Sequence, residues 1–152
     1  MSILVSTVWH SGTNSLINQL GFDPKQYQDK DEKNGLKVFH CCDDATALAK
    51  SGKYKVYTTK RSPADVGKSW GKRRNRFRHD VWKTQWENYV KILPLATVVP
   101  VETMTERLNA SNESSRFTVP QESIDWAVEL IEANDPKQRQ YGNERLPVKS
   151  NS

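Results

Sequence analysis

Residues 10–15 (HSGTNS) have the composition of a phosphate-binding loop and follow a short apolar run, residues 3–8. A glycine lets the backbone approach an anion, and the first amides of a following helix point at that anion with a favourable dipole. Hydroxyl and amide side chains in the loop add further donors. No Gly-Lys-Ser/Thr follows at the required spacing, so the loop is not a Walker A motif. The segment favours a phosphate site, and an ordinary connection between a strand and a helix is the alternative.

Arg61 and Ser69 form a second candidate anion site, behind another predicted strand at residues 54–59. Arginine offers a planar fork for a phosphate and stays charged at neutral pH. Ser69 comes eight residues later, two turns into a helix whose start is predicted by the N-cap residue Ser62. The alternative is that Arg61 only neutralises the carboxyl end of a strand and that Ser62 only caps a helix.

His40 lies at the end of the second predicted strand, residues 36–41, and precedes Arg61 by 21 residues. With an unperturbed pKa of about 6.5, a histidine there suits a general base at neutral pH. Parallel strands present their carboxyl ends at one edge of a sheet, where ligands bind. We therefore expect His40 near both loops, with a purely structural histidine as the alternative.

The hydrophobic periodicity and the turn residues predict an α/β domain. Strands are expected at 3–8, 36–41, 54–59 and 96–101, and helices at 14–20, 45–50 (capped by Asp43 and Asp44), 65–93 (broken near Gly71) and 118–133. Residues 23–35 are expected to form an exposed connection. This order predicts a three-layer α/β/α fold with a central, mostly parallel sheet, as one domain over residues 1–133 followed by a polar tail at 134–152.

Taken together, the two loops and the histidine resemble the P-loop sulfotransferase family, whose members use 3′-phosphoadenosine 5′-phosphosulfate (PAPS). Members carry a loop similar to Lys/Arg-Ser-Gly-Thr-Thr after the first strand. A later strand ends in an arginine, followed by Asp-Val and by a serine eight residues after the arginine, a pattern that Asp65 and Val66 complete here. The resemblance covers about residues 3–104. The chain is short for the family and departs from it at His10, where members usually have lysine or arginine.

The resemblance implies a role for each of these residues. The first loop would bind the 5′-phosphosulfate and the arginine–serine pair the 3′-phosphate. His40 would remove the proton from an acceptor hydroxyl, and His10 would lie beside the bridging oxygen of the donor. The residues that would bind the nucleotide are Ser11, Gly12, Thr13, Asn14, Ser15, Arg61 and Ser69. No metal is expected.

The net charge of +5 at pH 7 favours anionic partners and is concentrated in one segment. Between Lys68 and Lys83 seven basic side chains accompany a single acid, Asp80. Its densest part, residues 72–79, has three interpretations: a solvated helix face, support for an anionic cofactor or acceptor, and nonspecific binding of nucleic acid.

Cys41 and Cys42 are the two cysteines of the chain. Adjacent cysteines rarely bridge, so free thiols in a reducing cytoplasm are expected. No apolar run approaches the roughly 20 residues of a membrane-spanning helix, and no zinc-ligand spacing is present. We therefore expect a cytoplasmic protein that binds a small nucleotide and does not insert into a membrane.

The resemblance thus implies a PAPS-dependent sulfotransferase that transfers the sulfuryl group to a hydroxyl or amine, with an acceptor that the sequence does not identify. The alternative is a non-catalytic nucleotide- or anion-binding protein on the same fold, with nucleic acid as a less favoured partner. A nucleotide kinase is disfavoured because the loop lacks Gly-Lys.

Overall fold

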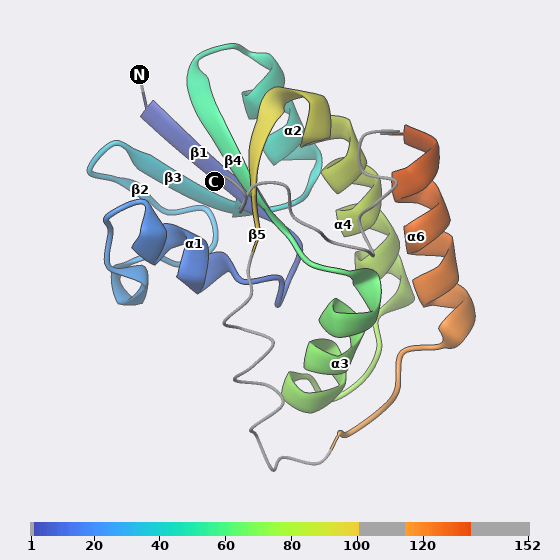
Figure 1. The fold of residues 1–152 in the computed structure, drawn as a ribbon. Coiled ribbons are helices and arrows are strands. Elements are labelled where there is room, and N and C mark those ends of the chain that lie inside the picture. Colours follow the sequence, from blue (N-terminus) through green and yellow to red (C-terminus); the bar gives the residue numbers. More distant parts are fainter. Residues whose placement is uncertain (1, 101–114, 135–152) are drawn as a thin grey trace.

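A five-stranded sheet forms the centre of the molecule in this computed structural model, which describes residues 2–100 and 115–134 (Figure 1). The strands, in the order β2-β3-β1-β4-β5, are β2 (Glu32–Lys33), β3 (Leu36–His40), β1 (Ser2–Thr7), β4 (Tyr54–Lys60) and β5 (Ala96–Pro100). All neighbouring pairs are parallel except β2 and β3. The predicted α/β class with a mostly parallel sheet is confirmed.

Helices bury both faces of this sheet. Successive residues of a strand point to opposite faces, and on β1 Leu4 belongs to one buried cluster while Val5 belongs to the other. The face of Val5 packs against α1 (Thr13–Gln19), and the face of Leu4 against α2 (Asp43–Lys50) and α4 (His79–Ile92). Both residues are fully buried, as expected for a strand covered on both sides.

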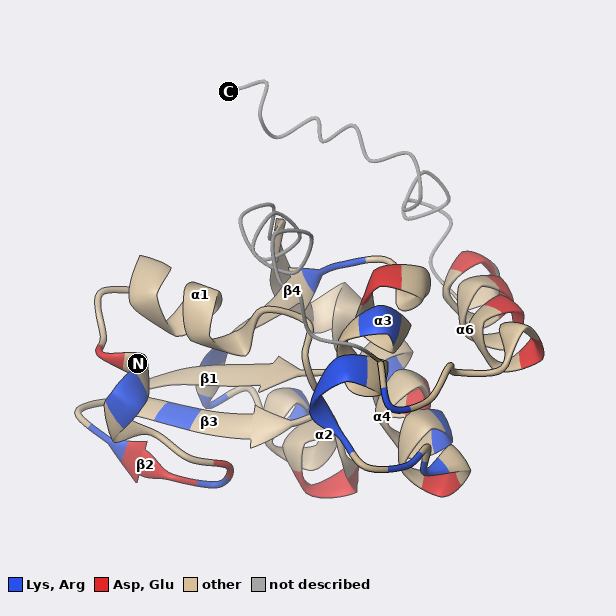
Figure 2. Ribbon diagram, turned by 90° about the horizontal axis from the view of Figure 1, so that it is seen from below, with Lys and Arg blue, Asp and Glu red and all other residues tan. Residues whose placement is uncertain are grey.

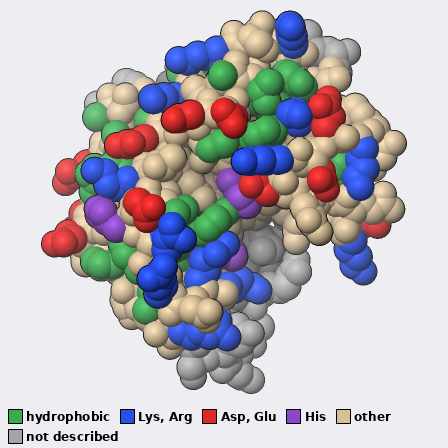
Figure 3. Space-filling view, turned by 180° about the vertical axis from the view of Figure 1, so that it is seen from behind, with side chains coloured by type: hydrophobic (Ala, Val, Ile, Leu, Met, Phe, Trp, Pro, Cys, Tyr) green, Lys and Arg blue, Asp and Glu red, His purple; other side chains and the backbone are tan. Residues whose placement is uncertain are grey.

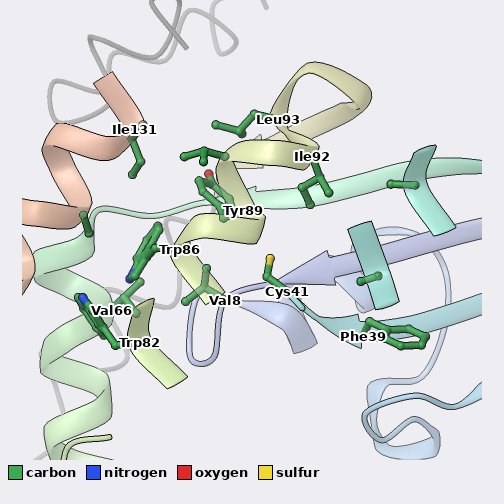
Figure 4. Packing of buried hydrophobic residues seen from close by; sticks show 14 of the residues in the cluster. Val8, Phe39, Cys41, Val66, Trp82, Trp86, Tyr89, Ile92, Leu93 and Ile131 are labelled. Carbon is green, nitrogen blue, oxygen red and sulfur yellow. The ribbon is translucent and has the colours of Figure 1, made fainter. Parts of the chain in front are cut away.

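Aromatic side chains dominate the larger cluster. Trp70, Trp82, Trp86 and Tyr89 are almost fully buried and contact one another in series, with ring centroids 5.2–5.8 Å apart. Figure 4 shows the last three of these side chains. Helix α6 (Gln121–Asn134) packs against α4, and its Ser123 carbonyl accepts a hydrogen bond of 3.0 Å from Trp82 Nε1. Such rings bury large apolar areas, so this cluster anchors the helices on that face.

The prediction of a long basic helix at residues 65–93, broken near Gly71, is wrong in one respect. Helix α3 (Pro63–Arg73) begins as expected, with the Ser62 side chain accepting from the backbone N–H of Asp65. The break, however, falls at residues 74–78 and not at Gly71. Gly71 lies inside α3, where it is required for a different reason: a Cβ there would collide with the Phe117 carbonyl oxygen. Like charges four residues apart disfavour a helix through 74–78.

Two smaller expectations also need correction. Residues 23–35 contain a 3-10 turn, η1 (Pro24–Gln26), and the short strand β2. Cys42 is the N-cap residue of α2, so Asp43 and Asp44 occupy its first turn, where they favour the helix dipole. The predicted tail lies outside the described residues from position 135 onward, as does Val101 in the predicted fourth strand.

Candidate functional site

The candidate site lies where the order of the strands reverses. The chain passes from β1 to β3 on one side and then to β4 on the other side of β1. Leu16 and Ile17 of α1 pack on one face, whereas Val66 and Trp70 of α3 pack on the other. The connections that follow β1 and β4 therefore leave the carboxyl ends of these strands toward opposite faces of the sheet. This arrangement forms ligand crevices in α/β folds.

Hydroxyl side chains of the first loop, residues 10–15, form hydrogen bonds to other groups of the protein. The Ser11 hydroxyl donates to the Val8 carbonyl at 2.6 Å and shares a second hydrogen bond of 2.8 Å with Thr59 Oγ1 on β4. The Thr13 hydroxyl shares a 2.6 Å hydrogen bond with Thr7 Oγ1. These contacts fix the loop between two strands, so the anion donors that the loop can offer are mainly backbone amides.

The backbone of this loop has the geometry of a close turn. His10 and Gly12 have φ values of 63° and 101°, in the left-handed region that glycine adopts without strain. Gly12 is the N-cap of α1, whose first amides have no acceptor within the helix. Asn14 is exposed beside them, and Ser15 Oγ accepts a hydrogen bond from Gln19.

Arg61 joins the second loop to the first. Its side chain is 4% exposed, and Nη1 donates to the His10 carbonyl at 2.5 Å. Ser69 is also buried, with 1% exposed, within α3. The structure therefore brings the predicted arginine to the first loop but places it beneath the surface of the crevice, where it also holds the two loops together.

Both predicted catalytic histidines lie at this edge and are neutral at pH 7. Burial, together with the charges of Arg74 and Arg73, lowers the pKa of His10 to about 3. Burial also lowers the pKa of His40, and the nearby Asp29 opposes this shift. A neutral His40 can accept a proton as a general base, whereas a neutral His10 supplies no positive charge.

Trp9 and Arg74, which the sequence did not single out, complete the site. The guanidinium carbon of Arg74 lies 3.3 Å from the ring centroid of Trp9, and the Trp9 ring meets His40 edge-on at 5.4 Å. The backbone N–H of Trp9 donates to Gln85 Oε1 at 2.6 Å, which fixes the turn against α4. The position of Trp9 directly after the first predicted strand could have pointed to it as a site residue. Nothing in the sequence distinguished Arg74 from the other basic residues of its segment.

Buried polar atoms without a hydrogen-bond partner gather around Trp9. Among the residues that the structure describes, Trp9 Nε1, His10 Nε2, His40 Nδ1 and Arg74 Nε are buried and unpaired. Leaving such a group unpaired costs about 1–3 kcal/mol. Four such atoms on neighbouring side chains make this edge a candidate place for a ligand, although the indole nitrogens of Trp70 and Trp86 in the core are unpaired as well.

An open cavity of about 450 Å³ adjoins His40. Its walls include Trp9, Asp29, Cys42 and Thr84 as well as His40. Figure 3 shows the face opposite that of Figure 1, where histidine side chains reach the surface next to basic side chains. The cavity can take a small molecule next to the histidine that would act as base.

The basic run is a surface segment between two helices. Arg73, Arg76 and Arg78 are exposed, and Arg78 forms an ion pair of 3.4 Å with Asp80. Figure 2 shows these charges between α3 and α4, with acidic residues along α6. The described residues hold no group of three potential metal ligands. None of their helices has the length and apolar character of a membrane span.

Comparisons with protein-family models, with curated proteins and with solved structures find no match for this chain.

Proposed function

We propose that this protein binds PAPS and transfers its sulfuryl group to a hydroxyl or amine. The observation that carries the proposal is the meeting of three distant sequence elements at one sheet edge. Arg61 contacts the His10 carbonyl, and His40 pairs in register with Thr7, directly before the first loop. These are the elements whose pattern resembles the sulfotransferase family.

The residues at this edge fit an anionic donor. The amides at the start of α1 and the Asn14 side chain are suited to the 5′-phosphosulfate. Arg61 and Ser69 would hold the 3′-phosphate, with Arg61 supplying a charge that does not titrate. PAPS supplies an activated sulfuryl group bonded to a phosphate oxygen. The unpaired buried polar atoms around Trp9 are consistent with a polar occupant beside them.

His40 is assigned as the general base. It is neutral and forms part of the cavity wall, so an acceptor in the cavity could donate a hydrogen bond to it. In the transfer, the acceptor oxygen or nitrogen forms a bond to sulfur while the bond from sulfur to the bridging phosphate oxygen breaks. The acceptor proton passes to His40, and the electron pair of the broken bond stays on the departing nucleotide phosphate.

One observation favours the non-catalytic alternative. The pKa of His10 is lowered to about 3, so residue 10 does not provide the cation found at the corresponding family position. A protein that holds the nucleotide without transferring the sulfuryl group would tolerate this neutral side chain.

Nucleotide selectivity tests the proposal. Adenosine 3′,5′-bisphosphate should raise the melting temperature more than AMP or ATP does at equal concentration, since a ligand at one hundred times its Kd adds about 2.7 kcal/mol. Arg61→Ala should abolish the preference, and Ser69→Ala should weaken it with less risk to the fold. Equal stabilisation by AMP and the bisphosphate would show that there is no 3′-phosphate site.

Catalysis is tested by following labelled sulfate from PAPS to phenols, sugars, amines and water. His40→Ala should lower turnover about 10²–10⁴-fold and leave bisphosphate affinity nearly unchanged. His79→Ala, at an exposed histidine, is the control. Full activity of His40→Ala would return this histidine to a structural role. Tight donor binding with no transfer would favour the non-catalytic alternative.

A further inference from the structure

We infer that Arg74 supplies the positive charge that residue 10 lacks, by binding the 5′-phosphate end of the donor and stabilising the departing phosphate. This inference rests on the proposed function and adds a residue to it. It concerns a side chain that is distant in sequence from both loops and reaches the first loop across the surface of Trp9.

The local backbone directs Arg74 toward the site. Helix α3 ends at Arg73, and Arg74 has φ −117° and ψ 161°, an extended conformation that turns the chain away from the helix axis. Its backbone N–H still donates to the Trp70 carbonyl at 2.9 Å. The hydrogen bond to Trp70 thus fixes the backbone of Arg74 at the end of α3. Its guanidinium group lies over the Trp9 ring.

Stacking on Trp9 leaves the hydrogen-bonding edge of the guanidinium available. All five N–H donors of an arginine lie in the plane of the group, so its flat face can contact a ring while the edge binds an anion. The Nε atom is buried and has no partner among the described residues. No carboxylate in this part of the chain forms an ion pair with Arg74, in contrast to Arg78, which pairs with Asp80.

The neighbours of Arg74 indicate where its anion would lie. Its charge acts on both His10 and His40, so the guanidinium lies near the first loop and near the proposed base. The other permanently charged groups that act on His10 are Arg73 and Arg61, and neither is an acid. An anion on the His10 side of Arg74 would meet the charges of these arginines, whereas Asp29 acts on His40 and not on His10.

The chemistry of transfer needs a cation at this place. When the bond from sulfur to the bridging oxygen breaks, negative charge develops on the nucleotide phosphate, and fixed donors aimed at that charge lower the barrier. Arg74 would donate to this phosphate, while His40, on the edge of the same tryptophan, takes the acceptor proton. Trp9 would then position the base and the cation on a single rigid ring.

Isothermal titration of the full chain with adenosine 3′,5′-bisphosphate and adenosine 3′-monophosphate tests the inference, because the two ligands differ only in the 5′-phosphate. Arg74→Gln should weaken binding of the bisphosphate about 10- to 100-fold, as expected for a hydrogen bond to a charged group, and leave the 3′-monophosphate unchanged. Arg74→Lys should restore part of the loss. Arg76→Gln, at an exposed arginine of the same segment, is the matched control.

Two other results for Arg74→Gln would contradict the inference. Equal weakening of both ligands by Arg74→Gln would show that Arg74 only supports the fold, and unchanged binding would show that it does not touch the 5′-phosphate. Either result overturns the inference and leaves the proposed function standing. Wild-type protein that binds neither nucleotide would overturn the proposed function and the inference with it.

Discussion

Two neighbouring parts of the carboxyl edge use their polar side chains in opposite ways. In the loop that leads into α1, Ser11 and Thr13 satisfy their hydroxyl groups with the chain's own carbonyl and hydroxyl oxygens. Around Trp9, the polar atoms of His10, His40 and Arg74 are buried without such partners. In the loop, the hydroxyl groups already have partners within the protein. Around Trp9, several polar atoms have no partner among the described residues and can form hydrogen bonds with a ligand.

The difference separates residues that hold the fold from residues that can act on a ligand. A side chain whose hydrogen bonds are internally satisfied contributes to stability and has little left to offer a substrate. Buried polar atoms without a partner cost stability, and at a sheet edge they are available to pair with a ligand. The comparison predicts that substitutions in the two parts affect stability and binding differently.

The largest effect is expected from acidification. The folded-state pKa of His10 is about 3, below its ordinary value of 6.5, so protonation favours the unfolded chain. This contribution is fully present above pH 6.5 and is lost as pH falls toward 3, amounting to a few kcal/mol at about 1.4 kcal/mol per pKa unit. His10→Asn, which tolerates the left-handed backbone, should flatten the urea-unfolding free energy across this range. His79→Asn should follow the wild-type curve, and an identical curve for His10→Asn would contradict the assigned burial.

A pair of matched tryptophan substitutions should give the next largest difference. Trp82→Phe removes an indole N–H that donates to the Ser123 carbonyl, whereas Trp9→Phe removes one without a partner among the described residues. Trp82→Phe should therefore cost about 1–3 kcal/mol more in unfolding free energy than Trp9→Phe. Chemical denaturation measures both. Equal losses would mean that the Trp9 indole is hydrogen-bonded in solution.

A pair of serines should give the smallest effect. Ser11 and Ser51 each donate to the carbonyl three residues earlier at 2.6 Å, but Ser11 is buried and also bonds to Thr59, whereas Ser51 is exposed. Ser11→Ala should lower the unfolding free energy by about 1 kcal/mol and Ser51→Ala by a few tenths. Bisphosphate affinity should change little in either variant. A large loss of affinity in Ser11→Ala would show that its hydroxyl binds the ligand directly.

The sequence predicted the sheet and the edge at which the candidate residues meet, because alternation of apolar residues and turn signals are local properties. The parallel pairing of β1 with β3 and β4 then brings His40 and Arg61 to the first loop. The end of the first basic helix was placed too early, at Gly71, because a glycine is a usual break signal, whereas here it packs inside α3 against the Phe117 carbonyl oxygen, which is remote in sequence. The burial of Arg61 depends on the packing of two loops and was likewise not readable from its residue type.

Strand β2 was missed for a related reason. Its two residues, Glu32 and Lys33, are charged and exposed and carry no apolar alternation. They become a strand by pairing antiparallel with Lys37 and Leu36 of β3. A short charged strand gives no periodic signal of its own, so only the tertiary pairing reveals it.

The row of indole rings should give the protein a near-ultraviolet signal that responds to changes at one end of the row. Trp9, Trp70, Trp82 and Trp86 follow one another at centroid distances of 5.3–5.8 Å, close enough for their excited states to couple. A change in the charge resting on Trp9 would therefore alter the near-ultraviolet circular dichroism of the whole row. Binding of the anion proposed for Arg74 should then be detectable without a label, through rings that extend from the sheet edge to Trp82, which bonds to α6.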